Sequence, residues 1–254
     1  MLSGPAFIIS DTHLGAASPA VERALLGYLR ALRGRATTLV VNGDLFDFWF
    51  EWKTVIPRGA FKVLGALSEL KESGTEIIWV AGNHDCWGGE VLRDDLGVDY
   101  RMDAWEGKLA GWRVRIEHGD GLREHEDQAY RRVRTVLRNP LAIRLFRFLH
   151  PDWATKIATG TSRTSRDHRA RDEGKGLRAV AHAALAADPA LDLLVYAHSH
   201  VATLERAGRG VYANAGSWLD APTYLSLSDR SIELREWGGS LDSPALASLE
   251  RIAG

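Results

Sequence analysis

The sequence contains little that would cross-link it through disulfides or hold it in a membrane. A single cysteine, Cys86, leaves no partner for a disulfide within the chain and is compatible with a reducing compartment. No run of about 18 apolar residues is present, so we expect no transmembrane helix. The first residues lack a basic segment followed by a long apolar stretch, so we expect no signal peptide. These absences favour action in the cytoplasm, including at a membrane surface.

Net charge is also nearly absent, at −1 for the whole chain, and predicts no partner. The charges are nevertheless unevenly distributed. Residues 123–178 contain 14 Lys and Arg against 7 Asp and Glu, whereas the remainder contains 18 against 26. A basic segment on an acidic body suits an anionic ligand or surface, although a solvated helical face would have the same composition.

Repeats and low-complexity tracts are missing too, and 254 residues suit one α/β domain with an insertion, or two small domains. Buried-strand patterns alternate with amphipathic helical patterns at the start of the chain. Strands are expected at 5–10, 37–41 and 76–81, and helices at 21–33 and 59–73, the second with Phe61 on its apolar face. This order indicates a layered α/β fold with parallel strands, which places ligands beyond the C-terminal strand ends.

The rest of the chain predicts a helical insertion and further strands. Residues 127–158 have a helical pattern broken at two prolines, and the polar, basic residues 159–176 suit a mobile loop. We expect 121–176 to be an insertion or cap on a single domain, and 238–254 to be a small appendage. Further strands are expected at 112–117 and 191–197, and four more, forming a second, antiparallel sheet, at 202–206, 210–214, 222–227 and 231–236.

Polar side chains follow five of these strands, at the point where each strand ends. The segments are Asp11-Thr12-His13, Gly43-Asp44, Gly82-Asn83-His84-Asp85, His118-Gly119-Asp120 and His198-Ser199-His200. One Asp or His at a strand end is more often structural, and Gly43-Asp44 alone could be a turn. Five such ends in order favour a metal site instead.

The candidate ligands are more numerous than one four-coordinate ion needs. They are Asp11, His13, Asp44, Asn83, His118, His198 and His200. Mixed nitrogen and oxygen donors without thiolate suit two divalent ions, such as Mn²⁺, Fe²⁺, Zn²⁺ or Co²⁺. Asp44, in the middle of the set, is the natural bridging carboxylate. Two such ions polarise a phosphoryl oxygen and activate a shared water, which predicts hydrolysis of a phosphate ester or anhydride.

His84 adjoins Asn83 and need not be a ligand. We expect it to donate a proton or a hydrogen bond to the leaving group or a phosphoryl oxygen. Asp85 is the expected partner that orients the His84 imidazole.

These motifs resemble those of the calcineurin-like metallophosphoesterases over about residues 6–217. The resemblance implies a sandwich of two mixed sheets flanked by helices. It also implies Asp11, His13 and His200 on one ion, Asn83, His118 and His198 on the other, and Asp44 between them.

A narrower resemblance is to the UDP-2,3-diacylglucosamine pyrophosphohydrolases of lipid A synthesis. The segments that carry it are Gly43-Asp44-Leu45-Phe46-Asp47, His118-Gly119-Asp120-Gly121-Leu122, Asp127-Gln128-Ala129-Tyr130, Asn139-Pro140 and Ser162-Arg163-Thr164-Ser165-Arg166. It implies hydrolysis to UMP and 2,3-diacylglucosamine 1-phosphate, usually with Mn²⁺, at the cytoplasmic face of the inner membrane. Under it the cap holds the acyl chains, and substrate contacts are expected from Asn83, His84, Asp127, Tyr130, Ser162 and Arg166.

The sequence differs from the best-known branch of that subfamily at His84, where that branch has Arg. The substrate contacts of that branch therefore transfer to this sequence less directly. A soluble nucleotide pyrophosphate or phosphodiester is the alternative substrate, and a non-catalytic metal-binding scaffold is the alternative of another class. The sequence contains no specific nucleic-acid-binding motif, and we expect no obligate protein partner.

Overall fold

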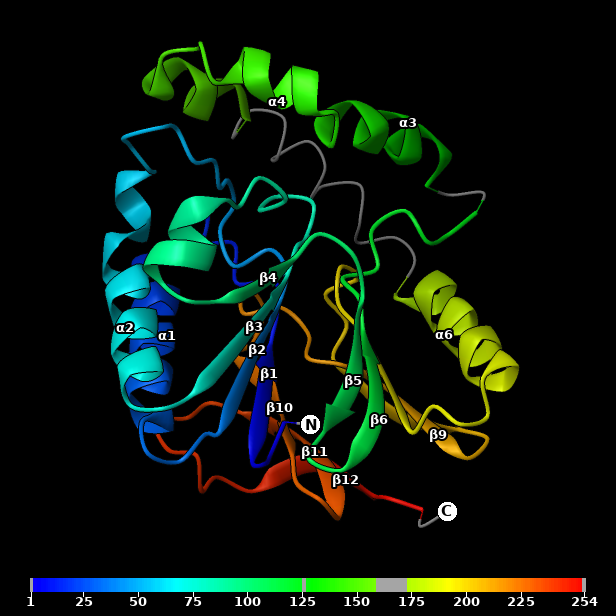
Figure 1. Cartoon of the computed structure of the whole chain (residues 1–254). Coiled ribbons are helices and arrows are strands. Elements are labelled where there is room, and N and C mark those ends of the chain that lie inside the picture. The colour runs from blue at the N-terminus through cyan, green and yellow to red at the C-terminus, as the bar shows by residue number, and fades with distance from the viewer. Residues whose placement is uncertain (1, 125–126, 159–172, 253–254) are drawn as a thin grey trace.

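The computed structural model describes residues 2–124, 127–158 and 173–252, and two β-sheets packed face to face form its centre (Figure 1). One sheet has seven strands in the order β12-β11-β10-β1-β2-β3-β4, and the other has five in the order β5-β6-β7-β9-β8. The predicted sandwich of two mixed sheets flanked by helices is confirmed.

The first sheet is parallel at one side and antiparallel at the other. Strands β1 to β4 run parallel, whereas β10, β11 and β12 join antiparallel beyond β1. Their bounds are β1 Ala6–Ile9, β2 Thr38–Asn42, β3 Glu76–Val80, β4 Asp99–Arg101, β10 Thr223–Leu227, β11 Ser231–Glu236 and β12 Ala245–Glu250.

The second sheet has a parallel centre, β6-β7-β9, between two antiparallel edge strands. Its strands are β5 Trp105–Leu109, β6 Trp112–Ile116, β7 Leu193–Tyr196, β8 Thr203–Ala207 and β9 Gly210–Asn214. Alternate residues of β1, such as Ile8, point into the core between the sheets, while Phe7 and Ile9 face the helices. Both faces of the central strands are therefore buried, as parallel strands require.

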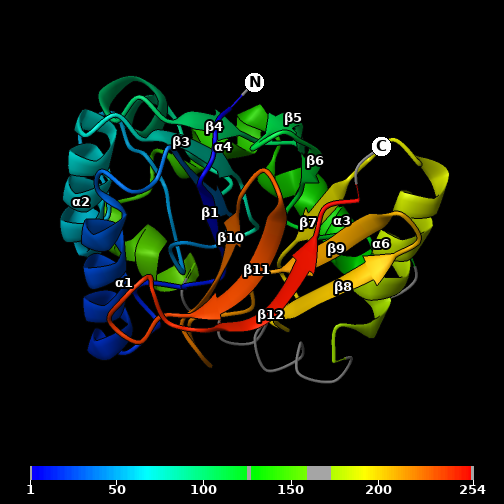
Figure 2. The same ribbon diagram turned by 90° about the horizontal axis from the view of Figure 1, so that it is seen from below.

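Helices cover the outer face of each sheet. Figure 2 shows α1 (Pro19–Leu32) and α2 (Phe61–Glu72) on one side of the molecule and α6 (Lys175–Ala187) on the other. The short turns η1 (Arg58–Ala60) and η2 (Val91–Asp95) complete this layer. Helix α1 packs because its apolar residues recur at helical spacing, and Leu25, Leu29 and Leu32 are buried against the sheet.

Three details differ from the sequence predictions. The four late strands do not form one antiparallel sheet, because β8 and β9 extend the second sheet while β10 and β11 pair beside β1. The expected C-terminal appendage forms β12, an edge strand of the first sheet. Phe61 begins α2 and is 77% exposed, so it lies off the apolar face of that helix.

The helical segment after β6 lies over one end of both sheets (Figure 1). We call residues 128–158 the cap segment; it comprises α3 (Gln128–Leu137), α4 (Pro140–Phe146), the helical residues 151–158 and the turns between them. Asn139 starts α4 by accepting hydrogen bonds at Oδ1 from the backbone N–H groups of Leu141 and Ala142. No helix in the described part of the chain is long and apolar enough to cross a membrane.

Indole side chains from the core attach the cap segment. Trp52 Nε1 donates to Leu149 O at 3.2 Å, and Trp87 Nε1 donates to Leu137 O at 2.7 Å. Below these bonds lies a cluster of apolar side chains drawn from both parts, namely Phe48, Phe50, Trp52, Trp87, Ile143, Phe146, Ala154 and Ala158.

Candidate metal centre

The motif-bearing loops meet at one edge of the sandwich, beneath the cap segment (Figure 1). The C-terminal ends of parallel strands lie at a common edge, so the loops after β1, β2, β3, β6 and β7 converge. The carboxylates and imidazoles they bring together are almost entirely shielded from solvent. Asp11, His13 and Asp44 are 0% exposed, His118 is 1% exposed and His198 is 6% exposed.

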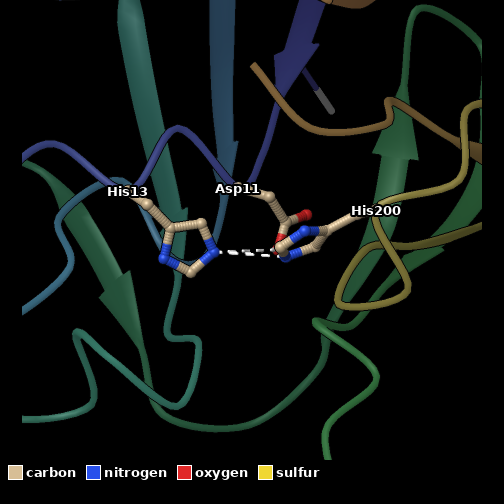
Figure 3. A group of neighbouring side chains, drawn as sticks. All are labelled: Asp11, His13 and His200. Atoms are coloured by element: carbon tan, nitrogen blue, oxygen red, sulfur yellow. Dashed lines mark hydrogen bonds and ion pairs between the residues drawn. The ribbon is translucent and has the colours of Figure 1, made fainter. Parts of the chain in front are cut away.

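The first cluster consists of Asp11, His13 and His200, whose side chains point toward one another (Figure 3). His13 Nε2 lies 3.2 Å from His200 Nε2, and His200 Nε2 lies 3.4 Å from Asp11 Oδ1. Two ring nitrogens and a carboxylate oxygen thus face a common point, which is the arrangement that a divalent cation needs.

The second cluster consists of Asp44, His118 and His198. His118 Nε2 lies 3.3 Å from Asp44 Oδ2, and the same oxygen lies 3.8 Å from His13 Nε2. Asp44 therefore stands between the two clusters, in the position of the predicted bridging ligand. Asn83, which supplies an amide instead of a charge, follows β3 in the loop that contains His84.

Some nitrogen and oxygen atoms of the clusters lack hydrogen-bond partners within the described part of the chain, which suits the binding of divalent cations. Asp11 Oδ1 and His118 Nε2 are buried and form no hydrogen bond with the described residues, which is costly for polar atoms unless an ion binds them. His118 Nδ1 donates to Asn42 O at 2.9 Å, so Nε2 is the nitrogen left to act as a ligand. No cysteine takes part, and nitrogen and oxygen donors of this kind suit Mn²⁺, Fe²⁺, Zn²⁺ or Co²⁺.

The electrostatics of the pocket also favour positive charge. Burial lowers the pKa of His118, but the adjacent Asp44 carboxylate outweighs burial and raises that pKa to about 10. Burial raises the pKa of Asp44, yet the surrounding imidazoles of His118 and His84 hold it well below its usual range. The carboxylates thus remain ionised in a buried site that stabilises added positive charge.

Most of the candidate ligands adopt a backbone conformation that side chains normally avoid. The φ angles of the non-glycine residues concerned are 49° for Asp11, 44° for His13, 53° for Asp44, 60° for His198 and 63° for His200. Left-handed backbone of this kind costs on the order of 1 kcal/mol per residue and is concentrated at functional sites. Backbone hydrogen bonds maintain it, including Asp11 N to Gly43 O and His13 N to Asp44 O.

Two motif glycines are required by the closeness of these loops. A Cβ on Gly82 would collide with the side chain and backbone nitrogen of Asp44. A Cβ on Gly43 would collide with the His118 ring and with Gly82, and Gly43 also has a φ of +79°. The glycine before each motif residue therefore allows the loops after β2 and β3 to touch.

His84 is held at the boundary between the clusters and the cap segment. Its Nδ1 donates to Asp47 O at 2.8 Å, and its Nε2 lies 3.8 Å from Asp44 Oδ2. The residue also lines a cavity, so a phosphoryl group bound at the clusters would lie near the ring. This placement suits the predicted contact with a leaving group or a phosphoryl oxygen.

The prediction that Asp85 orients His84 is wrong. The Asp85 carboxylate accepts hydrogen bonds from the backbone N–H groups of Leu45 and Gly82 and from Trp79 Nε1. It therefore joins the loop after β2 to the end of β3. Burial and the nearby Asp44 carboxylate raise the pKa of Asp85 to about 7. Asp47, which the sequence analysis did not single out, holds the imidazole instead.

A cavity of about 450 Å³, which we call the cap cavity, lies between His84 and the cap segment. His84, Asn83 and Asp47 form its polar end. The remaining lining side chains are mainly apolar, namely Phe48, Trp87, Tyr130, Val133, Val136, Leu137, Ala142, Ile143, Phe146, Ile157 and Ala158. The cavity thus joins an apolar chamber to the polar site.

The other residues predicted to contact the substrate lie in different places. Tyr130 lines the cap cavity, and its hydroxyl donates to Asp120 Oδ2 at 2.7 Å. Asp127, directly before α3, neither lines this cavity nor belongs to the clusters. Its carboxylate instead accepts hydrogen bonds from the backbone N–H and the guanidinium of Arg123. Ser162 and Arg166 lie outside the described residues.

Asp120 is a functional candidate that sequence reasoning missed, although it stands inside the quoted His118 motif. Besides Tyr130, it faces Arg134 Nε at 3.4 Å and Arg138 Nη2 at 3.8 Å, and its backbone oxygen accepts from Arg134. These contacts tie α3 to the loop that carries His118. Only the spacing of arginines along α3 could have indicated a buried acidic partner.

Comparison with known proteins agrees with this geometry. Residues 4–202 match the calcineurin-like phosphoesterase family. UDP-2,3-diacylglucosamine hydrolase of Porphyromonas gingivalis is 37% identical over 70% of this chain and 68% of its own length. The enzyme of that name from Neisseria meningitidis serogroup B is 32% identical over 64% of this chain and 67% of its own length.

Among solved structures, Yfce, a phosphoesterase from E. coli, aligns over 97% of this chain and 98% of its own. Its sequence identity is 21% and its TM-score is 0.48. The family match extends through the five motifs to the last cluster ligand, His200. The chain belongs to the calcineurin-like phosphoesterases.

Proposed function

We propose that this protein hydrolyses the pyrophosphate bond of UDP-2,3-diacylglucosamine, giving UMP and 2,3-diacylglucosamine 1-phosphate. The observation that carries the proposal is the apolar cap cavity that borders His84 beside the two clusters. A lipid-linked substrate needs such a chamber next to the reacting phosphate, and the similar enzymes from P. gingivalis and N. meningitidis are named for this substrate.

The side chains divide the work of the reaction. One divalent ion would be held by Asp11, His13 and His200. The other would be held by His118, His198 and Asn83, and Asp44 would contact both ions. When bound, such ions polarise a phosphoryl oxygen and lower the pKa of a water molecule. His84, fixed by Asp47, presents Nε2 to the phosphoryl group or the leaving oxygen. Among the ions that these donors suit, we propose Mn²⁺, which the resemblance to the lipid A enzymes implies.

The cap segment separates this substrate from a soluble one. A nucleotide pyrophosphate without acyl chains would leave the apolar walls of the cap cavity in contact with water. Burying alkyl chains there gains roughly 0.8 kcal/mol per methylene group. The cap cavity therefore favours a substrate with an acyl chain over the soluble alternative.

The outer face of the cap segment suits the place where such a substrate resides. Large apolar side chains there are strongly exposed, with Leu145 70%, Phe148 82% and Trp153 71% accessible. Arg144 and Arg147 lie on the same segment and would meet anionic head groups. We propose that the protein acts in the cytoplasm and binds peripherally to the inner membrane through this face.

The test is hydrolysis of UDP-2,3-diacylglucosamine with Mn²⁺, beside UDP-N-acetylglucosamine and bis(p-nitrophenyl) phosphate. Rapid release of UMP from the acylated substrate alone is the expected result. Comparable slow turnover of all three would overturn the lipid substrate and leave a general phosphoesterase.

A matched pair of variants locates the acyl site. Ala142→Phe places a ring inside the cap cavity, whereas Ala183→Phe places the same ring on the exposed face of α6. Only the first should raise KM for the acylated substrate. Equal KM values in the two variants would argue against acyl binding in the cap cavity.

A further inference from the structure

A second cavity adjoins the candidate metal centre and shares part of its lining with the cap cavity. It has a volume of about 820 Å³ and lies between the loop after β1, the start of α1, the segment 56–60 and the cap residues 151–156. Leu14 and Gly15 line it directly after the ligand His13. We call it the side cavity.

The two cavities meet at Asp47 and Phe48, which line both. Asp47 Oδ1 lies 3.6 Å from His13 Nδ1 and 3.8 Å from His84 Nδ1. The metal centre therefore stands at the junction of two chambers. A molecule with a diphosphate in its middle can place its phosphates there and extend one half into each chamber.

The chambers differ sharply in polarity. Apart from its polar end, the cap cavity is walled mainly by hydrocarbon and aromatic side chains. The side cavity combines aromatic walls, Phe46, Phe48 and Trp52, with ionisable groups. Those groups are Glu22, Asp47, Arg58, Asp152 and Lys156. An alkyl chain placed in the side cavity would desolvate these groups without pairing them, and this outweighs the greater volume of the chamber.

We infer that the side cavity binds the uridine 5′-phosphate half of the substrate while the cap cavity holds the acylated sugar. This inference rests on the proposed function for the identity of the nucleotide. A planar base can stack on the aromatic wall, and ribose hydroxyls can donate to carboxylates such as Glu22. The Arg58 guanidinium forms no hydrogen bond or ion pair with the described residues and can meet a phosphate.

The acyl half does not need the larger chamber. Val133 and Val136 line the cap cavity, yet they are 51% and 62% exposed, so this chamber opens toward the outer face of the cap segment. A chain longer than the cavity can continue along the exposed apolar side chains there. The assignment of the two halves is therefore consistent with both volumes.

Gly59 allows the inference to be tested without disturbing the fold. It lines the side cavity, and a Cβ built on it meets nothing within 4 Å, so Gly59→Phe puts a ring into open space. Gly65, on α2, is exposed and equally unobstructed, but it lines neither cavity, so Gly65→Phe is the matched control.

The experiment is isothermal titration of the Mn²⁺-loaded full chain with UMP, and separately with inorganic phosphate. We expect Gly59→Phe to raise the Kd for UMP about tenfold or more, as loss of a fitted subsite does, with phosphate binding and melting temperature retained. Gly65→Phe and Ala142→Phe should bind UMP as the wild type does. Ala142→Phe reports on the other chamber, so the pair assigns each half of the substrate.

Two results would overturn the inference: failure of the wild type to bind UMP, or an unchanged Kd for UMP in Gly59→Phe. Hydrolysis of UDP-2,3-diacylglucosamine by the wild type tests the proposed function separately. If the wild type hydrolyses this substrate but Gly59→Phe leaves the Kd for UMP unchanged, the side cavity is not the nucleotide site and the proposed function stands. UMP binding that depends on Gly59 without turnover would support the nucleotide site and refute the function.

Discussion

The metal centre and the cap segment are built in opposite ways. The candidate ligands lie on short loops at strand ends and are shielded from solvent, and backbone hydrogen bonds join their loops. The cap segment lies outside both sheets, is attached through indole hydrogen bonds and a shared apolar cluster, and exposes most of its large apolar side chains. Under the proposed function, the shielded part would position the chemistry and the cap segment would contact the lipid half of the substrate. Substitutions in the two parts should therefore fail in different ways.

The largest effect is expected from Asp44→Asn. The substitution removes the carboxylate that serves both clusters, so both metal sites should weaken together and turnover should fall by more than about 100-fold. Metal content by inductively coupled plasma mass spectrometry, with kcat, checks this. Asp229→Asn, in the exposed turn between β10 and β11, is the control. Full metal content and normal turnover in Asp44→Asn would show that Asp44 is not a metal ligand.

His84→Ala should lower kcat for the lipid substrate by about 10²–10⁴-fold while both metals stay bound. The loss should be smaller for bis(p-nitrophenyl) phosphate, because p-nitrophenolate departs without protonation. Rates on the two substrates, with metal content, check both points. Loss of a metal ion would instead make His84 a ligand, as its 3.8 Å separation from Asp44 Oδ2 would permit.

Asp120→Asn tests the attachment of the cap segment to the shielded part. The variant removes the carboxylate that faces Arg134 and leaves Asp103 as the remaining carboxylate beside Arg138. It also weakens the bond to Tyr130, so α3 should loosen. We expect KM for the acylated substrate to rise roughly tenfold with a smaller change in kcat. Steady-state kinetics separate the two constants. Tyr130→Phe, which removes a single hydrogen bond, should give a milder form of the same change. A fall in kcat alone would mean that Asp120 acts through His118.

The smallest effect on the fold is expected from the triple variant Leu145→Ser, Phe148→Ser and Trp153→Ser. These side chains are exposed, so each change should alter the free energy of unfolding by no more than about 0.5 kcal/mol. Binding to vesicles of anionic phospholipid should weaken nonetheless, measured by co-sedimentation. Turnover of substrate in vesicles should fall a few-fold, and turnover in detergent should not. Unchanged sedimentation would exclude this face as the membrane contact.

The sequence predicted which polar residues lie together better than it predicted the surroundings of each one. Asp11, His13, Asp44, His118, His198 and His200 could be found because each follows a strand whose direction fixes where its end lies. The partner of His84 could not be found this way. Asp85 and Asp47 are both close to His84 in space, and only the packing of β3 against the loop after β2 decides which one it contacts.

The same limit applies to the fold. The parallel pairing of β1, β2 and β3 follows from the alternation of strands and helices along the chain. The pairing of β1 with β10 joins residues more than two hundred positions apart, and strand propensity does not encode such partners. The misplacement of β10 and β11 arose from this, since both were predicted as strands but with the wrong neighbours, whereas β12 was not predicted as a strand at all.

The left-handed backbone at Asp11, His13, Asp44, His198 and His200 has a consequence for how metals enter and leave. Hydrogen bonds between loops maintain several of these conformations: Asp11 N and His13 N donate to backbone oxygens, and His198 N donates to Asp11 Oδ2. The candidate ligands are therefore held together before a cation binds. We expect one divalent ion to be replaceable by another on dialysis without unfolding of the chain.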